Sequence, residues 1–369
     1  MKLKKELLLI ILASFLVTFL VWLPFLLGFN GGIFTLFKNY DGPNYLVIAK
    51  SWYNKEFISS HFSLPTPVEY YPAHLPAYPL TISFFNLFFR GPTAMLNSTL
   101  FFTVLCAISF YLLVYKFKLS ENPLWLSLVF LVFPARWVVV KAVGSPEPLF
   151  IFAILASLYF FKSEKWLLAG IFGVLAQITK SPGILLFLSY LGYLGYLGFL
   201  GRRKIREIIK SSFPLFLIPL SVLAVFWFYK IRTGDFWAYF HSGDNFHLVF
   251  PPFQSFAQNR SWLGDFWRED MVWQYLLGAL TVILLIKQKL YDLASFAGVF
   301  FTVTLFVTHR DLARYSLPLV PFSLIAFDKF IQKKEFKIAL LIILPAIYLY
   351  TVNFITGNIA PIADWAPYL

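Results

Sequence analysis

Residues 7–27 read LLLIILASFLVTFLVWLPFLL, an uninterrupted apolar run that decides the class of protein. About 20 such residues cross the hydrocarbon core of a bilayer as one helix. The run follows Lys2, Lys4 and Lys5, is longer than the core of a signal peptide and contains no small-x-small cleavage site. It predicts a first membrane span that the protein retains.

Comparable apolar runs follow along the whole chain. Apolar residues make up 59% of the sequence and charged residues 13%, against about 25% charged in soluble domains. In lipid only helices or closed barrels satisfy their own backbone, and these runs lack the period-two alternation of a barrel. We therefore expect an all-α polytopic membrane protein, one transmembrane domain over 1–369. Its roughly eleven spans are expected near 7–27, 95–115, 122–134, 147–161, 166–179, 184–200, 212–229, 271–286, 291–308, 315–327 and 338–355.

The distribution of basic residues predicts the orientation. The net charge of +13 would suggest nucleic acid for a soluble protein, but here the positive-inside bias explains it and no nucleic-acid partner is expected. With the N-terminus inside and the C-terminus outside, 18 of the 31 Lys and Arg residues fall in short inner loops or tails. They are Lys2, Lys4, Lys5, Lys116, Lys118, Lys162, Lys165, Arg202, Arg203, Lys204, Arg206, Lys210, Lys287, Lys289, Lys329, Lys333, Lys334 and Lys337. The single cysteine, Cys106, allows no intrachain disulfide.

Polar residues collect in two long outer loops, 28–93 and 230–270. The first contains Asn39-Tyr40-Asp41-Gly42-Pro43-Asn44-Tyr45, where Asp, Gly and Pro predict a turn that opens a helix with Asp41 at its N-cap. Tyr45, Ile48, Ala49 and Trp52 then recur at helical spacing, which is typical of a helix lying at the membrane interface. Asp41 is thus a cap, a functional carboxylate, or both. Later in this loop, three prolines between Tyr70 and Leu80 exclude a straight spanning helix.

Single charges recur at the outer ends of the expected spans. Two are carboxylates, Asp41 and Glu147, and three are cations, Lys180, Arg310 and Arg314. Each taken alone has an ordinary explanation as an interfacial anchor, a snorkelling side chain or a helix-terminal charge. As a group they indicate a functional site, because ionisable residues at membrane depth are costly.

Other site chemistries are disfavoured by the sequence. There is no G-x-x-x-x-G-K-[ST] motif for ATP-driven transport and no Asp-x-Asp pair. The histidines are scattered, so a zinc site is not expected, although His61, Glu69 and His74 share one loop.

The combination of carboxylates and cations at the outer span ends suits glycosyl transfer from a lipid-linked sugar phosphate. One carboxylate acts as general base on an acceptor hydroxyl, and cations stabilise the charge on the departing phosphate. Phosphate leaves as a stable anion, so the second carboxyl of a glycosidase is not required.

Six motifs in order between residues 39 and 321 carry a family resemblance. They are Tyr40-Asp41 with Tyr45 and Ile48-Ala49; His74-Leu75-Pro76-Ala77-Tyr78-Pro79-Leu80; Ser145-Pro146-Glu147-Pro148-Leu149-Phe150; Trp166–Gly170 leading to Thr179-Lys180-Ser181-Pro182-Gly183; Thr233-Gly234-Asp235 through Phe240-His241; and Arg314-Tyr315 with Pro318 and Pro321. In these the chain resembles the GT-C superfamily of polyprenyl-phosphate-sugar glycosyltransferases. It is most similar to the PIG-V-type mannosyltransferases, which add the second mannose in GPI assembly, and their prokaryotic relatives. Tyr40 stands in place of the usual Trp, Lys180 in place of Arg, and His74-Leu75 in place of a Phe pair.

The resemblance implies a GT-C fold and an inverting hexosyl transfer, with mannose the expected sugar. Asp41 would be the catalytic base, and Lys180, Arg310 and Arg314 would contact the donor phosphate. The remaining matched or neighbouring polar residues would bind substrate: Tyr45, Glu69, His74, Tyr78, Glu147, Asp235, His241 and Tyr315. Such enzymes generally work without a bound metal, and we expect no cofactor. The implied partners are a polyprenyl- or dolichyl-phosphate-linked sugar, a glycan or glycolipid acceptor, and membrane lipids.

Two alternatives stay open at this point. One is a transporter or flippase for a lipid-linked or anionic substrate, for which inverted repeats are typical; the sequence shows no matching halves. The other is a polymerase or ligase of surface polysaccharide. In each case the protein is expected to be integral to the cell membrane of a prokaryote or the ER membrane of a eukaryote, with its site on the extracytoplasmic face.

Overall fold

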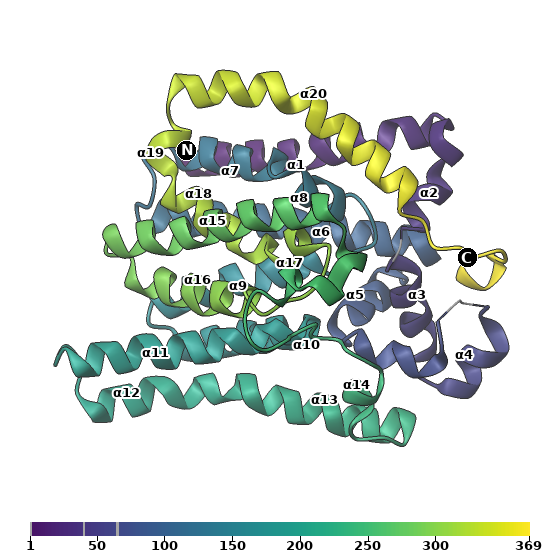
Figure 1. Ribbon diagram of the computed structural model, residues 1–369, viewed down its shortest axis with the longest axis horizontal. Helices are drawn as coiled ribbons and strands as arrows, with labels where there is room; N and C mark the ends of the chain where they lie inside the picture. Colours follow the sequence, from purple (N-terminus) through teal and green to yellow (C-terminus); the bar gives the residue numbers. More distant parts are fainter. Residues whose placement is uncertain (1, 40, 64–65) are drawn as a thin grey trace.

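The computed structural model describes residues 2–39, 41–63 and 66–369. Throughout this part of the chain the regular structure is helical, with two isolated β-bridges and no β-strand. Most of the long helices lie side by side across the molecule, with α1 starting at one end and the C-terminus at the other (Figure 1). The expected all-α class is confirmed.

Six helices in the described residues are long and apolar enough to cross a membrane. They are α1 (Lys2–Leu26), α6 (Gly91–Lys116), the turn η3 (Ser181–Ile184) with α11 (Leu185–Phe199), α12 (Ile205–Ser212) with the turn η4 (Phe213–Phe216) and α13 (Leu217–Thr233), α15 (Asp265–Lys287) and α20 (Lys334–Gly357). Their exposed faces are apolar; α1 exposes Leu8, Leu12 and Leu16 by about half. These helices indicate an integral membrane protein.

Five further expected spans coincide with shorter helices. They are α7 (Pro123–Val132), α9 (Glu147–Lys162), α10 (Trp166–Thr179), α16 (Tyr291–Thr304) and α18 (Val320–Ala326), the last preceded by α17 (Leu312–Tyr315) and η7 (Leu317–Leu319). Proline accounts for several boundaries, because Pro134, Pro182 and Pro318 lie where these helices end or restart. Helices thus lie at all eleven expected positions, while six have the length and composition of a full span.

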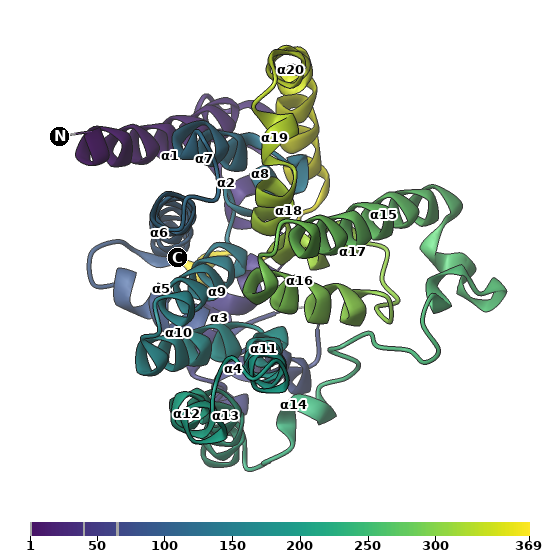
Figure 2. The same ribbon diagram turned by 90° about the vertical axis from the view of Figure 1, so that its left-hand side faces the viewer.

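Helix α9 lies at the centre of the fold. Twelve of its 16 residues are buried, and it packs against α6 and α10. Helix α10 packs in turn on α13 and on the turn η4 that precedes it. Gly170 permits a close approach to η4, because a Cβ there would lie 2.5 Å from the backbone oxygen of Pro214. On the other side α15, α16 and α18 pack together, and α20 packs on α8 (Ala135–Val140). The rotated view shows α9 near the middle of the molecule, with α6 on one side and α10 on the other (Figure 2).

The first long loop folds into short helices at one end of the molecule (Figure 1). They are η1 (Phe29–Gly31), α2 (Ile33–Phe37), α3 (Gly42–Ser51), α4 (Lys55–His61), η2 (Val68–Ala73) and α5 (Ala77–Phe85). Every residue of α3 from Gly42 to Ala49 is buried, so the helix that follows Asp41 has no face open to lipid or water. Its partners come from α5, α6 and the segment η8 (Ala366–Tyr368), and they cover the faces that were expected to meet lipid or water.

The second long loop is mostly irregular and extends away from the helices (Figure 2). It contains α14 (Ala238–His241) and the 3₁₀ turns η5 (Gln254–Phe256) and η6 (Gln258–Leu263), and Leu248 forms an isolated bridge with Val307. After α18, α19 (Asp328–Ile331) leads to α20. The residues that follow α20 return to the first loop, where Ile359 bridges Asn39.

Candidate functional site

Four charged side chains from distant parts of the sequence meet at the N-terminal end of α9. Asp41 directly precedes α3, Glu147 is the first residue of α9, Lys180 follows α10, and Arg314 lies in α17. We call these four residues the charge cluster. All four were predicted as site residues: Glu147, Lys180 and Arg314 from their positions at the ends of expected spans, and Asp41 from its place in the outer loop after the first span.

Two glycines bring Asp41 and Glu147 close together. A Cβ on Gly42 would lie 3.2 Å from the terminal carbon of Met95 and 3.4 Å from the backbone oxygen of Gly144. A Cβ on Gly144 would lie 2.3 Å from the Met95 sulfur, so the Met95 side chain would have to move to admit it. Glycine at both positions therefore lets the chain on either side approach α6 and places the two carboxylates in one site.

Arg314 links the two carboxylates. Its Nη1 lies 2.5 Å from Oδ2 of Asp41, and its Nε lies 2.7 Å from Oε1 of Glu147. The Nζ of Lys180 donates to the same Glu147 oxygen at 2.8 Å, and the Ser145 hydroxyl donates to the other. Both oxygens of Glu147 are thus occupied by protein donors, and its side chain is only 2% exposed.

The Asp41 side chain is more exposed than that of Glu147 and has fewer partners. Its side chain is 19% exposed, and Arg314 is the ion-pair partner found for it among the described residues. It occupies the predicted N-cap position of α3, but its side chain makes no capping hydrogen bond. Burial raises the pKa of the Asp41 carboxyl, while the charge of Arg314 and its hydrogen bond lower that pKa by more, so that it lies below its ordinary value. Asp41 is therefore an ionised carboxylate with room to accept a further hydrogen bond.

Aromatic side chains form one wall of the site. The ring of Tyr45 lies edge-on to His74 and to Tyr78, with centroids 4.8 and 5.0 Å away. The Tyr78 hydroxyl is hydrogen-bonded to Thr99 Oγ1 at 2.6 Å and accepts from the Ser145 N–H at 3.0 Å, which ties this wall to the Glu147 segment. On the other side, the Nζ of Lys180 lies 6.0 Å from the ring centre of Tyr315. The four predicted binding residues Tyr45, His74, Tyr78 and Tyr315 thus surround the charge cluster.

His74 is neutral in this environment. Burial lowers its pKa to about 4, against the opposing effect of the Asp41 charge. Its Nδ1 is buried and has no hydrogen-bond partner within the described part of the protein. A neutral imidazole with an unused nitrogen beside a carboxylate suits hydrogen bonding to a bound hydroxyl rather than ion pairing.

Arg310 lies outside the charge cluster. Its side chain is exposed, and it precedes α17 instead of lying within it. Its neighbour Asp311 points inward and pairs with Arg136, whose guanidinium carbon also lies 3.7 Å from the ring centre of Phe354. The structure therefore brings only the second of the two predicted arginines to the site.

The remaining predicted residues lie elsewhere. Glu69 lies 3.9 Å from Lys55 in an exposed pair. Asp235 and His241 pair with each other at 2.6 Å near the surface. Tyr40 lies outside the described residues. Within the described residues no three His, Cys, Asp or Glu side chains gather in a way that could hold a metal, and His61 stacks on Phe57 instead.

Two features of this region were not predicted. Ser145, two residues before Glu147, donates a hydrogen bond to one oxygen of the Glu147 carboxylate. The short spacing between the serine and the glutamate is the sequence feature that could have indicated this contact. Lys141, in the turn after α8, is completely buried, and its Nζ has no hydrogen-bond partner among the described residues. No sequence signal distinguished it from a basic residue in a solvated outer loop.

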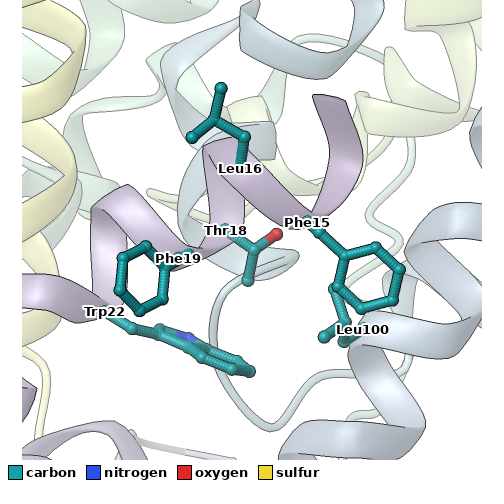
Figure 3. Close-up of a pocket in the computed structure, with 6 residues that line it drawn as sticks. All are labelled: Phe15, Leu16, Thr18, Phe19, Trp22 and Leu100. Atoms are coloured by element: carbon teal, nitrogen blue, oxygen red, sulfur yellow. The ribbon is translucent and has the colours of Figure 1, made fainter. Parts of the chain in front are cut away.

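An apolar pocket of about 360 Å³ lies between α1 and α6, away from the charge cluster. Figure 3 shows its lining, which contains Trp22, Leu100 and a single hydroxyl, that of Thr18. The Trp22 indole N–H donates to the backbone oxygen of Ala142 at 2.6 Å, so the pocket wall is attached to the segment that leads to Glu147. Without a charged group, this pocket offers apolar contact only.

Comparison with known proteins adds no family to this picture: no protein-family model and no curated protein matches the chain.

Proposed function

We propose that this protein is an inverting glycosyltransferase that moves a hexose, with mannose the expected sugar, from a polyprenyl-phosphate donor to a hydroxyl of a glycan or glycolipid acceptor. The observation that carries the proposal is the bridging position of Arg314 between Asp41 and Glu147, with Lys180 on the same Glu147 oxygen. It joins a partly accessible carboxylate to two cations in one site, which is the set of groups that this reaction requires.

In the proposed reaction Asp41 is the general base. It accepts the proton of the acceptor hydroxyl as the acceptor oxygen forms a bond to the anomeric carbon. The bond between that carbon and the donor phosphate oxygen breaks, and its electron pair stays on the phosphate. Attack from the face opposite the leaving group inverts the configuration. Cationic donors already in place stabilise the charge that develops on the phosphate.

Arg314 and Lys180 are the proposed phosphate ligands. The donor phosphate competes with the two carboxylates for them, and Arg is suited to this because its planar fork binds phosphate oxygens in pairs. When Arg314 turns toward the phosphate, Asp41 loses the partner that lowers its pKa and becomes a stronger base. Glu147, with both oxygens occupied, holds Arg314 and Lys180 in position and does not contact the sugar in this proposal.

The aromatic wall is the proposed sugar subsite. Tyr45 and Tyr315 offer aromatic rings and hydroxyls, and the free nitrogen of His74 offers one hydrogen bond, while the buried Tyr78 packs behind Tyr45 and supports the wall. The apolar helices around the site keep it within reach of a donor dissolved in the bilayer. The GT-C fold, the eleven spans and the extracytoplasmic placement of Asp41 are parts of this same proposal.

A transfer assay with defined lipid-linked monosaccharides tests it. Purified protein is incubated with polyprenyl-phosphate mannose, or glucose, and a panel of glycolipid acceptors, and consumption of the donor is measured. We expect Asp41→Asn to lower turnover about 10²–10⁴-fold, the contribution of a general base. Asp265→Asn, which removes a carboxylate that is 95% exposed and outside the cluster, is the matched control and should retain turnover.

Two results would overturn the proposal. One is donor turnover in Asp41→Asn that equals the wild type. The other is a donor that crosses the bilayer of reconstituted vesicles chemically unchanged, which would favour the transporter.

A further inference from the structure

A second group of charges lies at the opposite end of α9, around Lys162. There a cavity of about 150 Å³ opens between α9, α11 and α16. Its charged lining residues are Lys162, Glu164, Arg203 and Asp292, and its aromatic walls include Trp166 and Tyr193. Because α9 has 16 residues, this cavity lies about 24 Å along the helix from the charge cluster, and it belongs to a different site.

The two cations of this cavity are held differently. The Nζ of Lys162 lies 2.6 Å from Oδ2 of Asp292, whose side chain is only 8% exposed. Arg203 pairs with Glu164, whose side chain is 64% exposed, and its guanidinium also lies 5.2 Å from the ring centre of Trp166. An exposed partner is displaced at little cost, so Arg203 is the cation that an incoming anion can take over.

Helix α12 (Ile205–Ser212) flanks this cavity and presents a mixed surface. Ile205 and Ile209 are 76% and 65% exposed. Basic side chains lie beside them at Arg202, Lys204, Arg206 and Lys210, with Glu207 the one carboxylate of the helix. The Nη1 of Arg203 donates to the Ser211 hydroxyl at 3.4 Å, which joins the helix to the cavity.

We propose that the cavity and the adjoining face of α12 form a binding site for an anionic phospholipid, with the headgroup phosphate on Arg203 and the acyl chains along the exposed isoleucines. Charge complementarity and geometry together commit the site to lipid. The helical segment from Ile205 to Thr233, which consists of α12, η4 and α13, has 29 residues and is about 44 Å long, which exceeds the roughly 30 Å of the hydrocarbon core. Its first turns therefore lie at headgroup level, where basic residues meet phosphate and isoleucines meet the upper acyl chains.

Native mass spectrometry of the full chain in detergent tests this site. Phosphatidylglycerol and phosphatidylcholine with identical acyl chains are offered at equal concentration, and bound lipids are counted. We expect one phosphatidylglycerol to be retained preferentially by the wild type. Arg203→Gln should lower its affinity about fivefold, the change that corresponds to the loss of one basic residue near a lipid surface. Glu164→Gln should raise the affinity for phosphatidylglycerol, because the Glu164 carboxylate then no longer competes with the lipid phosphate for Arg203.

The matched control is Lys333→Gln, which removes an exposed cation before α20, away from the cavity. Equal losses in Lys333→Gln and Arg203→Gln would show general charge attraction and overturn a defined site. Equal retention of the two lipids by the wild type would also overturn it. So would displacement of the lipid by an equal concentration of glycerol 3-phosphate, since that would show a solute site. The gain expected for Glu164→Gln keeps the test decisive if Arg203→Gln fails to fold.

Discussion

Helix α9 carries a charged residue at each end, Glu147 at its first position and Lys162 at its last, and the two are partnered differently. Glu147 is 2% exposed and shares one oxygen between Arg314 and Lys180, while Arg314 also holds Asp41. Lys162 is 21% exposed and has one ion-pair partner, Asp292, within the described residues. The first arrangement is a connected network, and the second is a single ion pair with a buried carboxylate.

This difference determines how much stability the protein loses when one charged residue is removed. In a buried network each member compensates several others, so removing one leaves uncompensated charge in a poorly solvated place. In the Arg203–Glu164 pair near the other end, whose carboxylate is 64% exposed, water replaces a lost partner and the cost is small. A network whose members depend on each other is also one that an incoming anion can rearrange, and for this reason we place the chemistry there.

The largest stability effect is expected when the network loses its centre. Glu147→Ala removes the carboxylate that Arg314 and Lys180 share and leaves Lys180 without an ion-pair partner among the described residues. We expect the free energy of unfolding to fall by about 3–5 kcal/mol, the usual cost of breaking a buried ion pair from one side. Unfolding of the purified protein in mixed micelles, followed by circular dichroism, measures it.

Glu121→Ala is the control for this change, because it removes an exposed carboxylate in a loop. If Glu147→Ala lowers the free energy of unfolding no more than Glu121→Ala does, the description of a buried network is contradicted. The charges at the two ends of α9 would then contribute equally little to stability.

An intermediate effect on stability is expected from Lys141. It is buried, and its Nζ has no hydrogen-bond partner among the described residues. Burial lowers the pKa of Lys141 to about 7, against an ordinary value of 10.5. The unfolded chain thus binds one more proton than the folded protein between pH 7 and 10.5, so stability should rise with pH in that window. The slope contributed by this residue is at most about 1.4 kcal/mol per pH unit.

Lys141→Met removes this dependence. Methionine keeps most of the apolar volume without a charge, so at pH 7 we expect the variant to be more stable than the wild type by about 1–4 kcal/mol. The gap should narrow as the pH approaches 9.5. Thermal unfolding at pH 7, 8 and 9.5 compares the two proteins; a gap that stays constant with pH would show that Lys141 keeps its proton in the folded state over this range, and would contradict the lowered pKa.

The sequence anticipated the charge cluster because charges are rare in apolar surroundings. Asp41, Glu147, Lys180 and Arg314 stand out at the ends of apolar runs, and the structure gathers all four. The choice between Arg310 and Arg314 was beyond sequence reasoning, since both follow His309. It depends on where α17 begins, and the ion pair between Asp311 and the distant Arg136 anchors that turn.

The positions of the helices could be predicted from the sequence, but their lengths and neighbours could not. Apolar runs marked eleven helices, but the proline-interrupted ones are shorter than a span, and which of them reach across lipid depends on their neighbours. The burial of α3 was not predictable, because it is covered by residues from α6 and by the segment near residue 367, more than 300 positions away. An isolated helix with a polar start and apolar spacing has the same local sequence whether lipid or protein covers it.

The smallest effect is expected at the far end of α9, where Glu164→Gln removes the exposed half of the Arg203 pair. Arg203 keeps the ring of Trp166 and the hydroxyl of Ser211, and water replaces the lost carboxylate, so we expect a stability change below about 1 kcal/mol. The same unfolding measurement used for Glu147→Ala gives the value, and raising the salt concentration should shrink it further. If Glu164→Gln instead cost as much as Glu147→Ala, Arg203 would be compensating buried charge as Arg314 does, and the distinction between the two ends of the helix would fail.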